Sequence, residues 1–202
     1  MANRCIRMFF VVALGLWLTG CSIFNNKVLP EQPLAASARQ QQLQAMQQFS
    51  IQASVSIKTP QDSISGNLHW QQLQPKHYTA RLSNFLGISL FELEQSENGS
   101  QIQLKGEAYY GVDTSSLLWQ LSGWSMPLAD MPLWLRGLPG KNSQSIRYDE
   151  LGRVTHFNLI DSTGIIWQLE YQSFFTDSLA LPKRLLLSSD DTRIKLVIRS
   201  WQ

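Results

Sequence analysis

The most reactive group near the start of the chain is a cysteine that follows small and apolar residues. Arg4 and Arg7 precede the apolar segment MFFVVALGLWL, and LTGC then ends at Cys21. This order is typical of a bacterial lipoprotein signal peptide, and the apolar segment is short for a membrane span. In that chemistry the Cys21 thiol accepts a diacylglycerol, the chain is cut before Cys21, and the new amino group is acylated. We therefore expect a signal peptide over residues 1–20 and lipidation at Cys21; the alternative is an uncleaved anchor.

The cysteine count agrees with this interpretation. The chain has two cysteines, Cys5 and Cys21, so the processed chain would keep no free thiol and no disulfide. Two or more acyl chains attach a protein lastingly to a membrane. Ser22 follows the cysteine, and in lipoprotein sorting an Asp at this position retains the protein in the inner membrane. We therefore expect a lipid anchor in the inner, periplasmic leaflet of the outer membrane.

Other groups that could do chemistry are scattered. His69, His77 and His156 fall in separate strand patterns without metal-ligand spacing, and the Asp190-Asp191 pair is typical of a turn. No GxSxG, HExxH or CxxC motif occurs. The sequence predicts no enzyme, no metal site and no cofactor.

The charge balance argues against nucleic acid as a partner. The 202 residues carry 17 Lys and Arg against 15 Asp and Glu, and removing Arg4 and Arg7 with the signal leaves 15 of each. A chain without basic excess or charge clusters has no electrostatic footprint for nucleic acid. Seven tryptophans make it rich in aromatic residues.

The organisation is that of one domain behind a tether. Residues 21–33 form the lipidated N-terminus and, with two prolines, a flexible tether; residues 34–202 form a single domain. Helix formers over 34–49 predict a first helix. Alternating segments then predict antiparallel hairpins with one apolar face, at FSIQASVSIK, ISGNLHWQ, HYTARLS, ISLFELEQ, SQIQLKG, SIRYDE, RVTHFNLID, GIIWQLEYQ, PKRLLLSS and TRIKLVIRSW.

The middle of the chain changes to helical patterns. DTSSLLWQLSGW predicts a helix capped by Asp113 or Thr114, and a shorter helix is expected around Pro132 to Arg136. A sheet of roughly ten to eleven strands with one apolar face must curl and be covered. We therefore expect a mainly β (α+β) fold, an incomplete antiparallel β-barrel with helices plugging its concave apolar face and room for a ligand between them.

One turn has an unusual composition. In SNFLGISLFELEQ the turn residues Asn84 and Gly87 enclose Phe85 and Leu86, where polar residues are the rule. Held outward, these two side chains could enter lipid; alternatively Phe85 folds back onto the sheet and Leu86 is an ordinary exposed residue.

The segment GWSMPLADMPLWLRGLPG, Gly123 to Gly140, resembles the signature of the outer-membrane lipoprotein receptor LolB family. NFLGISLFELE resembles the family's Pro-Leu-Gly turn and following strand, with Phe85 in place of the usual Pro, which suggests a less rigid turn. QQLQAMQQFSIQASVSI and RIKLVIRSW also fit, so the similarity extends through nearly the whole processed chain.

The resemblance implies a function as well as a fold. A LolB-like receptor accepts triacylated lipoproteins from the periplasmic carrier LolA and places them in the inner leaflet of the outer membrane without nucleotide. By position, Leu86 of the protruding turn would act in delivery, with Phe85 beside it. The expected partners are LolA, lipoprotein clients and outer-membrane lipid, and the expected state is a monomer.

Candidates for the cavity wall come from the plug and the sheet. They are apolar side chains, each also suited to plain core: Leu68, Trp70, Leu117, Leu121, Trp124, Leu133 and Trp134. Arg136 is expected to be solvated, the alternatives being a latch or a carrier contact. Two other classes of function stay open, a module that binds free lipids or fatty acids and a structural envelope anchor.

Overall fold

The computed structural model describes residues 32–202. The expected signal peptide, Cys21 and most of the expected tether over 21–33 lie outside these residues. Within the described part, eleven strands form one antiparallel sheet in the order β6-β5-β4-β3-β2-β1-β11-β10-β9-β8-β7. The strands are β1 (Phe49–Lys58), β2 (Ser63–Gln74), β3 (His77–Ser83), β4 (Ser89–Ser96), β5 (Gly99–Leu104), β6 (Glu107–Gly111), β7 (Gln144–Tyr148), β8 (Val154–Ile160), β9 (Ile166–Phe174), β10 (Pro182–Ser188) and β11 (Arg193–Trp201).

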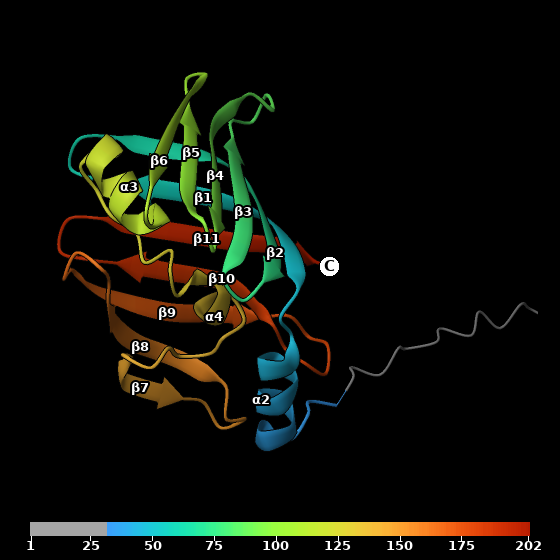
Figure 1. The fold of residues 1–202 in the computed structure, drawn as a ribbon. Coiled ribbons are helices and arrows are strands. Elements are labelled where there is room, and N and C mark those ends of the chain that lie inside the picture. Colours follow the sequence, from blue (N-terminus) through green and yellow to red (C-terminus); the bar gives the residue numbers. More distant parts are fainter. Residues whose placement is uncertain (1–31) are drawn as a thin grey trace, which may run out of the picture.

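The sheet curls without closing. Figure 1 shows β3 to β6 standing across the direction of β8 to β11, and β1 and β2 lie between these two groups in the strand order. Strands β6 and β7 end the strand order and do not pair with each other. The expected mainly β, incomplete antiparallel barrel is confirmed.

Alternation of apolar and polar residues explains which face is buried. In β1, the side chains Phe49, Ile51, Ala53, Val55 and Ile57 are all buried, while the residues between them are not. Successive side chains of a strand point to opposite faces, so a period of two places one set inside the curl. The same alternation of burial occurs in β2, β3, β9 and β11, whereas no residue of β7 is buried.

The eleventh strand, β6, is absent from the ten segments that alternation identified. It pairs with β5 across a two-residue turn in which Lys105 and Gly106 both have positive φ, 53° and 87°. Tight hairpin turns of this kind usually carry Asn, Asp or Gly at the first position, and Lys105 gives no such signal. Adjacent Tyr109 and Tyr110 also obscure the alternation.

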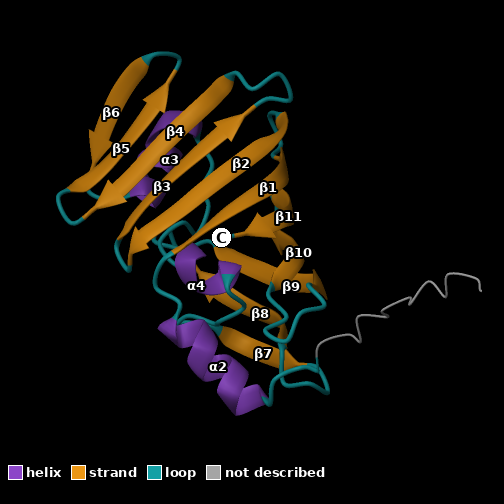
Figure 2. Cartoon of the chain, turned by 90° about the vertical axis from the view of Figure 1, so that its right-hand side faces the viewer, coloured by secondary structure: helices purple, strands orange, loops and turns teal. Residues whose placement is uncertain are grey.

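Three helices occupy the described chain: α2 (Ala36–Ala45), α3 (Thr114–Ser122) and α4 (Met131–Leu135). Figure 2 shows α3 against the concave side of β3 to β6, α4 near the centre of the curl, and α2 beside α4 and β7. Asp113 caps α3 by accepting a hydrogen bond from the Ser116 backbone N–H, as one of the two expected caps. Helix α2 ends before Met46, because the chain must turn to begin β1 at Phe49.

Five turns of the sheet lie at the same end of the strands. Because neighbouring strands are antiparallel, the turns at 59–62, 84–88, 105–106, 161–165 and 189–192 all belong to this end, which we call the rim. Among the described residues, no helix has the length and apolar character needed to cross a bilayer.

Candidate functional site

The turn between β3 and β4 holds three apolar side chains in solvent. Phe85 is 85% exposed and Leu86 is 71% exposed, and Ile88 is exposed beside them. Large apolar side chains gathered at one exposed tip are unusual on a protein that is not binding something there. The turn therefore offers a compact apolar tip at the rim.

The Asn84 side chain sets the shape of this turn. Its Oδ1 accepts hydrogen bonds from the backbone N–H groups of Leu86 (2.9 Å) and Ile88 (3.0 Å). The backbone closes around it, since Asn84 N–H donates to the Ile88 carbonyl and Gly87 N–H to the Asn84 carbonyl. Gly87 has φ 83°, which favours glycine. We expected a less rigid turn because Phe85 replaces the usual proline. These hydrogen bonds restrain the turn in its place.

The structure excludes one of the two alternatives for Phe85. Phe85 does not fold back onto the sheet, because its ring is the more exposed of the pair. That Phe85 and Leu86 enter lipid stays a prediction.

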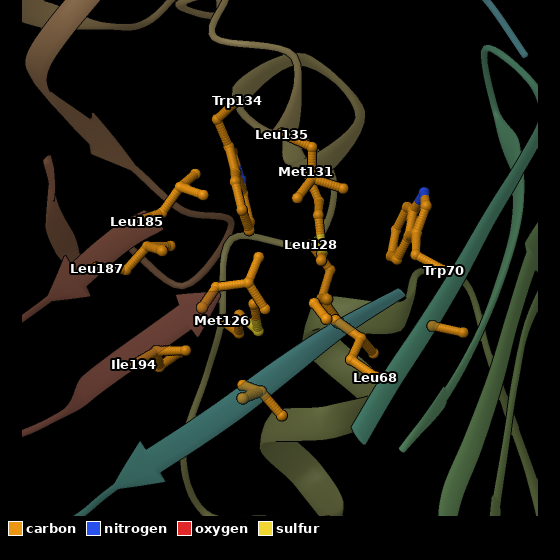
Figure 3. Packing of buried hydrophobic residues seen from close by; sticks show 14 of the residues in the cluster. Leu68, Trp70, Met126, Leu128, Met131, Trp134, Leu135, Leu185, Leu187 and Ile194 are labelled. Atoms are coloured by element: carbon orange, nitrogen blue, oxygen red, sulfur yellow. The ribbon is translucent and has the colours of Figure 1, made fainter. Parts of the chain in front are cut away.

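An apolar pocket lies beneath the strands that carry this turn. Its walls contain no exposed polar surface and come from β1 to β4, α3, α4 and the α3–α4 connector, residues 123–130, which we call the strap. The lining side chains are Val55, Ile57, Leu68, Trp70, Ala80, Leu82, Phe91, Leu93, Leu118, Trp124, Met126, Leu128 and Met131. Figure 3 shows Leu68 and Trp70 of β2 facing Leu128 and Met131, with Leu185, Leu187 and Ile194 beyond them.

The pocket is nearly filled in this conformation. Its volume is ≈ 30 Å³, which leaves space for only a few water molecules. An acyl chain is far larger, so it can enter only if the lining moves. The strap and α3 cover the pocket on the side opposite the sheet, so they are the parts that must move.

The pocket and the turn are continuous along β3 and β4. Leu82 and Phe91 are cross-strand partners and both line the pocket. The next pair, Ser83 and Ser89, leads directly into the turn. At this point β2 carries Gly66, and a Cβ there would lie 2.2 Å from the Ser83 carbonyl oxygen, so only glycine allows this close approach.

The structure separates the seven expected cavity residues into two groups. Leu68, Trp70 and Trp124 line the pocket. Leu117 and Trp134 are buried elsewhere in the main core, Leu121 packs against that core from its edge, and Leu133 packs on a second small cluster with Leu43, Leu138 and Leu181. Contact of any of them with an acyl chain stays a prediction.

Sequence reasoning missed the strap side chains Met126 and Leu128, together with Leu118 on α3. Met126 and Leu128 have no helical or strand period, so no periodic signal marks them as pocket residues. Leu118 is adjacent to Leu117, and only the orientation of α3 decides which of the two faces the pocket. The two prolines that flank Leu128 and Met131 are the one available signal that this connector has a set path.

Arg136 is buried, contrary to the expectation of a solvated side chain. Its guanidinium donates to the carbonyls of Leu43 and Met46 at the end of α2 and to Pro132 within α4. Helix ends leave carbonyls without partners, and a cation satisfies them well. Burial lowers the pKa of Arg136, and the group acts here as a clamp between two helices.

The other hollows do not suit an apolar ligand. One of ≈ 210 Å³ lies on the outward face of β2 to β5 and is lined by His69, Arg81, Glu92 and Glu94 among others. Arg81 and Glu92 form an ion pair there at 3.2 Å. His69 points outward as expected, and no group of three or more metal-ligating side chains occurs within residues 32–202.

An open antiparallel half-barrel whose concavity holds helices over an apolar pocket defines the class of this protein. A crystal structure with the same fold is a LolA superfamily protein from Nitrosomonas europaea, with a TM-score of 0.53 at 6% identity, covering 84% of this chain and 93% of that one. At this identity the likeness concerns the fold alone.

The sequence comparisons specify the family. The family described as "Outer membrane lipoprotein LolB" matches residues 47–201. Two proteins named outer-membrane lipoprotein LolB are similar over nearly full length: one from Pseudoalteromonas translucida (30% identity, 98% of this chain and 95% of that protein) and one from Pseudomonas paraeruginosa (32%, 98% and 96%). The chain belongs to the LolB family, and the resemblance noted in its sequence is confirmed.

Proposed function

We propose that this protein is an outer-membrane receptor that binds lipoproteins and releases them into the inner leaflet of that membrane. It accepts them from the periplasmic carrier LolA, and it is itself anchored in that leaflet through Cys21. The observation that carries the proposal is a closed apolar pocket, lined by Leu82 and Phe91 among others, on the same two strands that hold the exposed apolar tip at Phe85 and Leu86.

The physical chemistry of acyl chains explains why such a path is sufficient. Each methylene exposed to water is unfavourable by about 0.8 kcal/mol, so a triacylated client must pass from one apolar environment to the next. Transfer then follows the difference in affinity between carrier, receptor and bilayer, and no covalent step is required. The protein in this proposal is a binding protein and not an enzyme.

The tip would bring the rim to the membrane. Leu86 and Phe85 would each gain about 1.5–3 kcal/mol on entering lipid. Two such side chains on a turn that Asn84 holds in shape would press the pocket entrance against the leaflet. Release of the client would occur at that contact.

The test is delivery of a fluorescent lipoprotein from LolA through this protein into liposomes. For Leu86→Glu we expect normal folding and normal acceptance from LolA, but delivery slowed by about tenfold or more, since 1.4 kcal/mol of lost insertion corresponds to tenfold. The matched control is Val112→Glu, which changes another exposed apolar side chain directly after β6, at the end of the strands opposite the rim. It should deliver at the normal rate.

Two results would count against the proposal. Normal delivery by Leu86→Glu would remove the role of the tip. Uptake of free fatty acid without any acceptance of a lipoprotein from LolA would instead favour the free-lipid module that shares this pocket.

A further inference from the structure

The strap is tied to the sheet through one side chain. In the described part of the chain, its hydrogen bonds to the sheet pass through Ser125, whose hydroxyl donates to Asp161 Oδ2 at 2.6 Å. Thr163 lies at 3.5 Å from the same hydroxyl. Ser125 is buried, with 2% of its surface exposed. Trp124 and Met126, on either side of Ser125, line the pocket. The hydrogen bond therefore lies in the part of the strap that covers the pocket.

The carboxylate of Asp161 is held in place by groups other than Ser125. Its Oδ1 accepts from the Thr163 hydroxyl (2.6 Å) and from the backbone N–H groups of Thr163 (2.9 Å) and Ile165 (3.0 Å). Its Oδ2 also accepts from the buried Trp167 indole at 2.9 Å. The turn at 161–165 therefore holds the Asp161 carboxylate in position to accept a hydrogen bond at the rim. The turn would keep its shape without the strap.

The state of the carboxylate suits this role. Burial alone would raise the pKa of Asp161, but hydrogen bonds from Ser125, Thr163 and Trp167 lower the pKa below its ordinary value. The group is therefore ionised at neutral pH. Hydrogen bonds to an ionised acceptor are stronger than those between neutral groups.

The segments on either side of the strap are fixed by separate contacts. The start of α3 is held where Tyr78 and Thr114 share a hydrogen bond of 2.5 Å and Gln95 accepts from the Thr114 backbone N–H. Helix α4 is held by Tyr171, which donates to the Trp134 carbonyl at 2.6 Å, and by the Arg136 clamp. The second half of the strap is fixed to α4 as well, because the buried Trp134 indole donates to the Pro127 carbonyl at 3.1 Å. The first half of the strap, residues 123–126, and the end of α3, where Gly123 has φ 74°, are left as the part that can move.

We propose that Ser125 and Asp161 are positioning residues for client uptake, forming a latch that holds the strap over the pocket. This inference rests on the proposed function, because the latch matters only if acyl chains enter. With the latch closed, the pocket keeps its ≈ 30 Å³. With the latch open, Trp124 and Met126 move from the sheet and the pocket can take an acyl chain.

The first measurement is amide hydrogen exchange over residues 123–130, on the full lipid-anchored chain in phosphatidylethanolamine–phosphatidylglycerol vesicles. Ser125→Ala should raise exchange in the strap about tenfold, which corresponds to 1.4 kcal/mol of lost closure. Exchange in β8 and β9 should stay unchanged. Ser125→Thr keeps a hydroxyl and should exchange like the unaltered chain. Ser189→Ala removes a hydroxyl from a neighbouring rim turn and should leave the strap unchanged.

The second measurement is uptake of a dansyl-labelled triacyl lipopeptide by the same preparations, followed through energy transfer from tryptophan. A state that is rarely open reduces both the rate of entry and the apparent affinity, so Ser125→Ala should take up the probe about tenfold faster. A chain with cysteines at positions 125 and 161, joined by a short thiol cross-linker, should take up none until the linker is cleaved.

The outcomes distinguish a failure of the latch from a failure of the proposed function. If the unaltered chain takes up no lipopeptide, the proposed function fails, whatever the exchange data show. If it takes up the probe and Ser125→Ala does so at the same rate, or if strap exchange is unchanged in Ser125→Ala, the latch is wrong and the function stands.

Discussion

Single polar side chains hold both the exposed tip and the cover of the pocket. At the tip, Asn84 replaces the rigidity of a proline with two hydrogen bonds to backbone N–H groups. At the strap, the Ser125 hydroxyl donates to the Asp161 carboxylate, which other residues of the 161–165 turn hold in place. In both cases a short polar side chain forms hydrogen bonds directly beside large apolar side chains.

Asn84→Ala should loosen the tip and slow delivery. The loss of two exposed hydrogen bonds should lower the free energy of unfolding by about 1 kcal/mol, and amide exchange at Leu86 and Ile88 should rise. Delivery to liposomes should fall severalfold, since the apolar side chains are no longer held outward. The control is Thr59→Ala, which removes a similar acceptor for Gln61 and Asp62 in another rim turn. Equal delivery by the two variants would show that the shape of the tip has no role.

At the scale of elements, α2 and α4 are joined by a buried cation while α3 is attached at its start. Arg136 satisfies carbonyls at the end of α2 from within the α4 segment, and its guanidinium lies 5.9 Å from the Phe49 ring. The helices therefore differ in how firmly they are held. The one that is held at a single end lies over the pocket.

Arg136→Met should destabilise the fold strongly. The variant keeps much of the apolar stem but leaves buried carbonyls without a donor, so the free energy of unfolding should fall by about 2–4 kcal/mol in urea titrations. Arg199→Met removes an exposed guanidinium that donates to Ser54 and Asn67, and should cost less than about 1 kcal/mol. Similar losses in the two variants would contradict the clamp.

At the scale of the whole molecule, the curled sheet provides both the core and the pocket that we propose as the binding site. The pocket is part of the main apolar core, and its lining is packed almost as fully as the rest. A pocket packed this fully must open to take an acyl chain, which fits the proposal that a client is accepted and then released. Substitutions that loosen the pocket lining should therefore lower the free energy of unfolding and raise the affinity for acyl chains.

Leu118→Ala should lower the stability of the fold and raise its affinity for acyl chains. It removes a side chain from the pocket wall, so the free energy of unfolding should fall by about 2–4 kcal/mol, while affinity for the fluorescent lipopeptide rises because less lining must move. Leu187→Ala, in a buried site of β10 that does not line the pocket, should lose similar stability with no gain in affinity. A gain in both variants, or in neither, would contradict the pocket as the acyl site.

Much of the fold could be predicted from the sequence because the information is local. Alternation identified ten strands, Asp113 marked the start of α3, and Asn84 with Gly87 marked a turn whose apolar tip is exposed. Strand β6 was missed because its tight turn uses Lys105, where the usual turn residues are absent. Leu117 and Leu133 were expected in the cavity wall because hydrophobicity alone does not distinguish a pocket from a core.

The sequence by itself determined the period of each strand, the composition of the exposed turn and the membership of the LolB family, since each depends on neighbouring residues or on a contiguous motif. The tertiary structure decided which apolar side chains face the pocket, that Arg136 is buried, and that Ser125 meets Asp161. These depend on how far the sheet curls, because the curl sets the distance between segments that lie 36 or more positions apart in the chain.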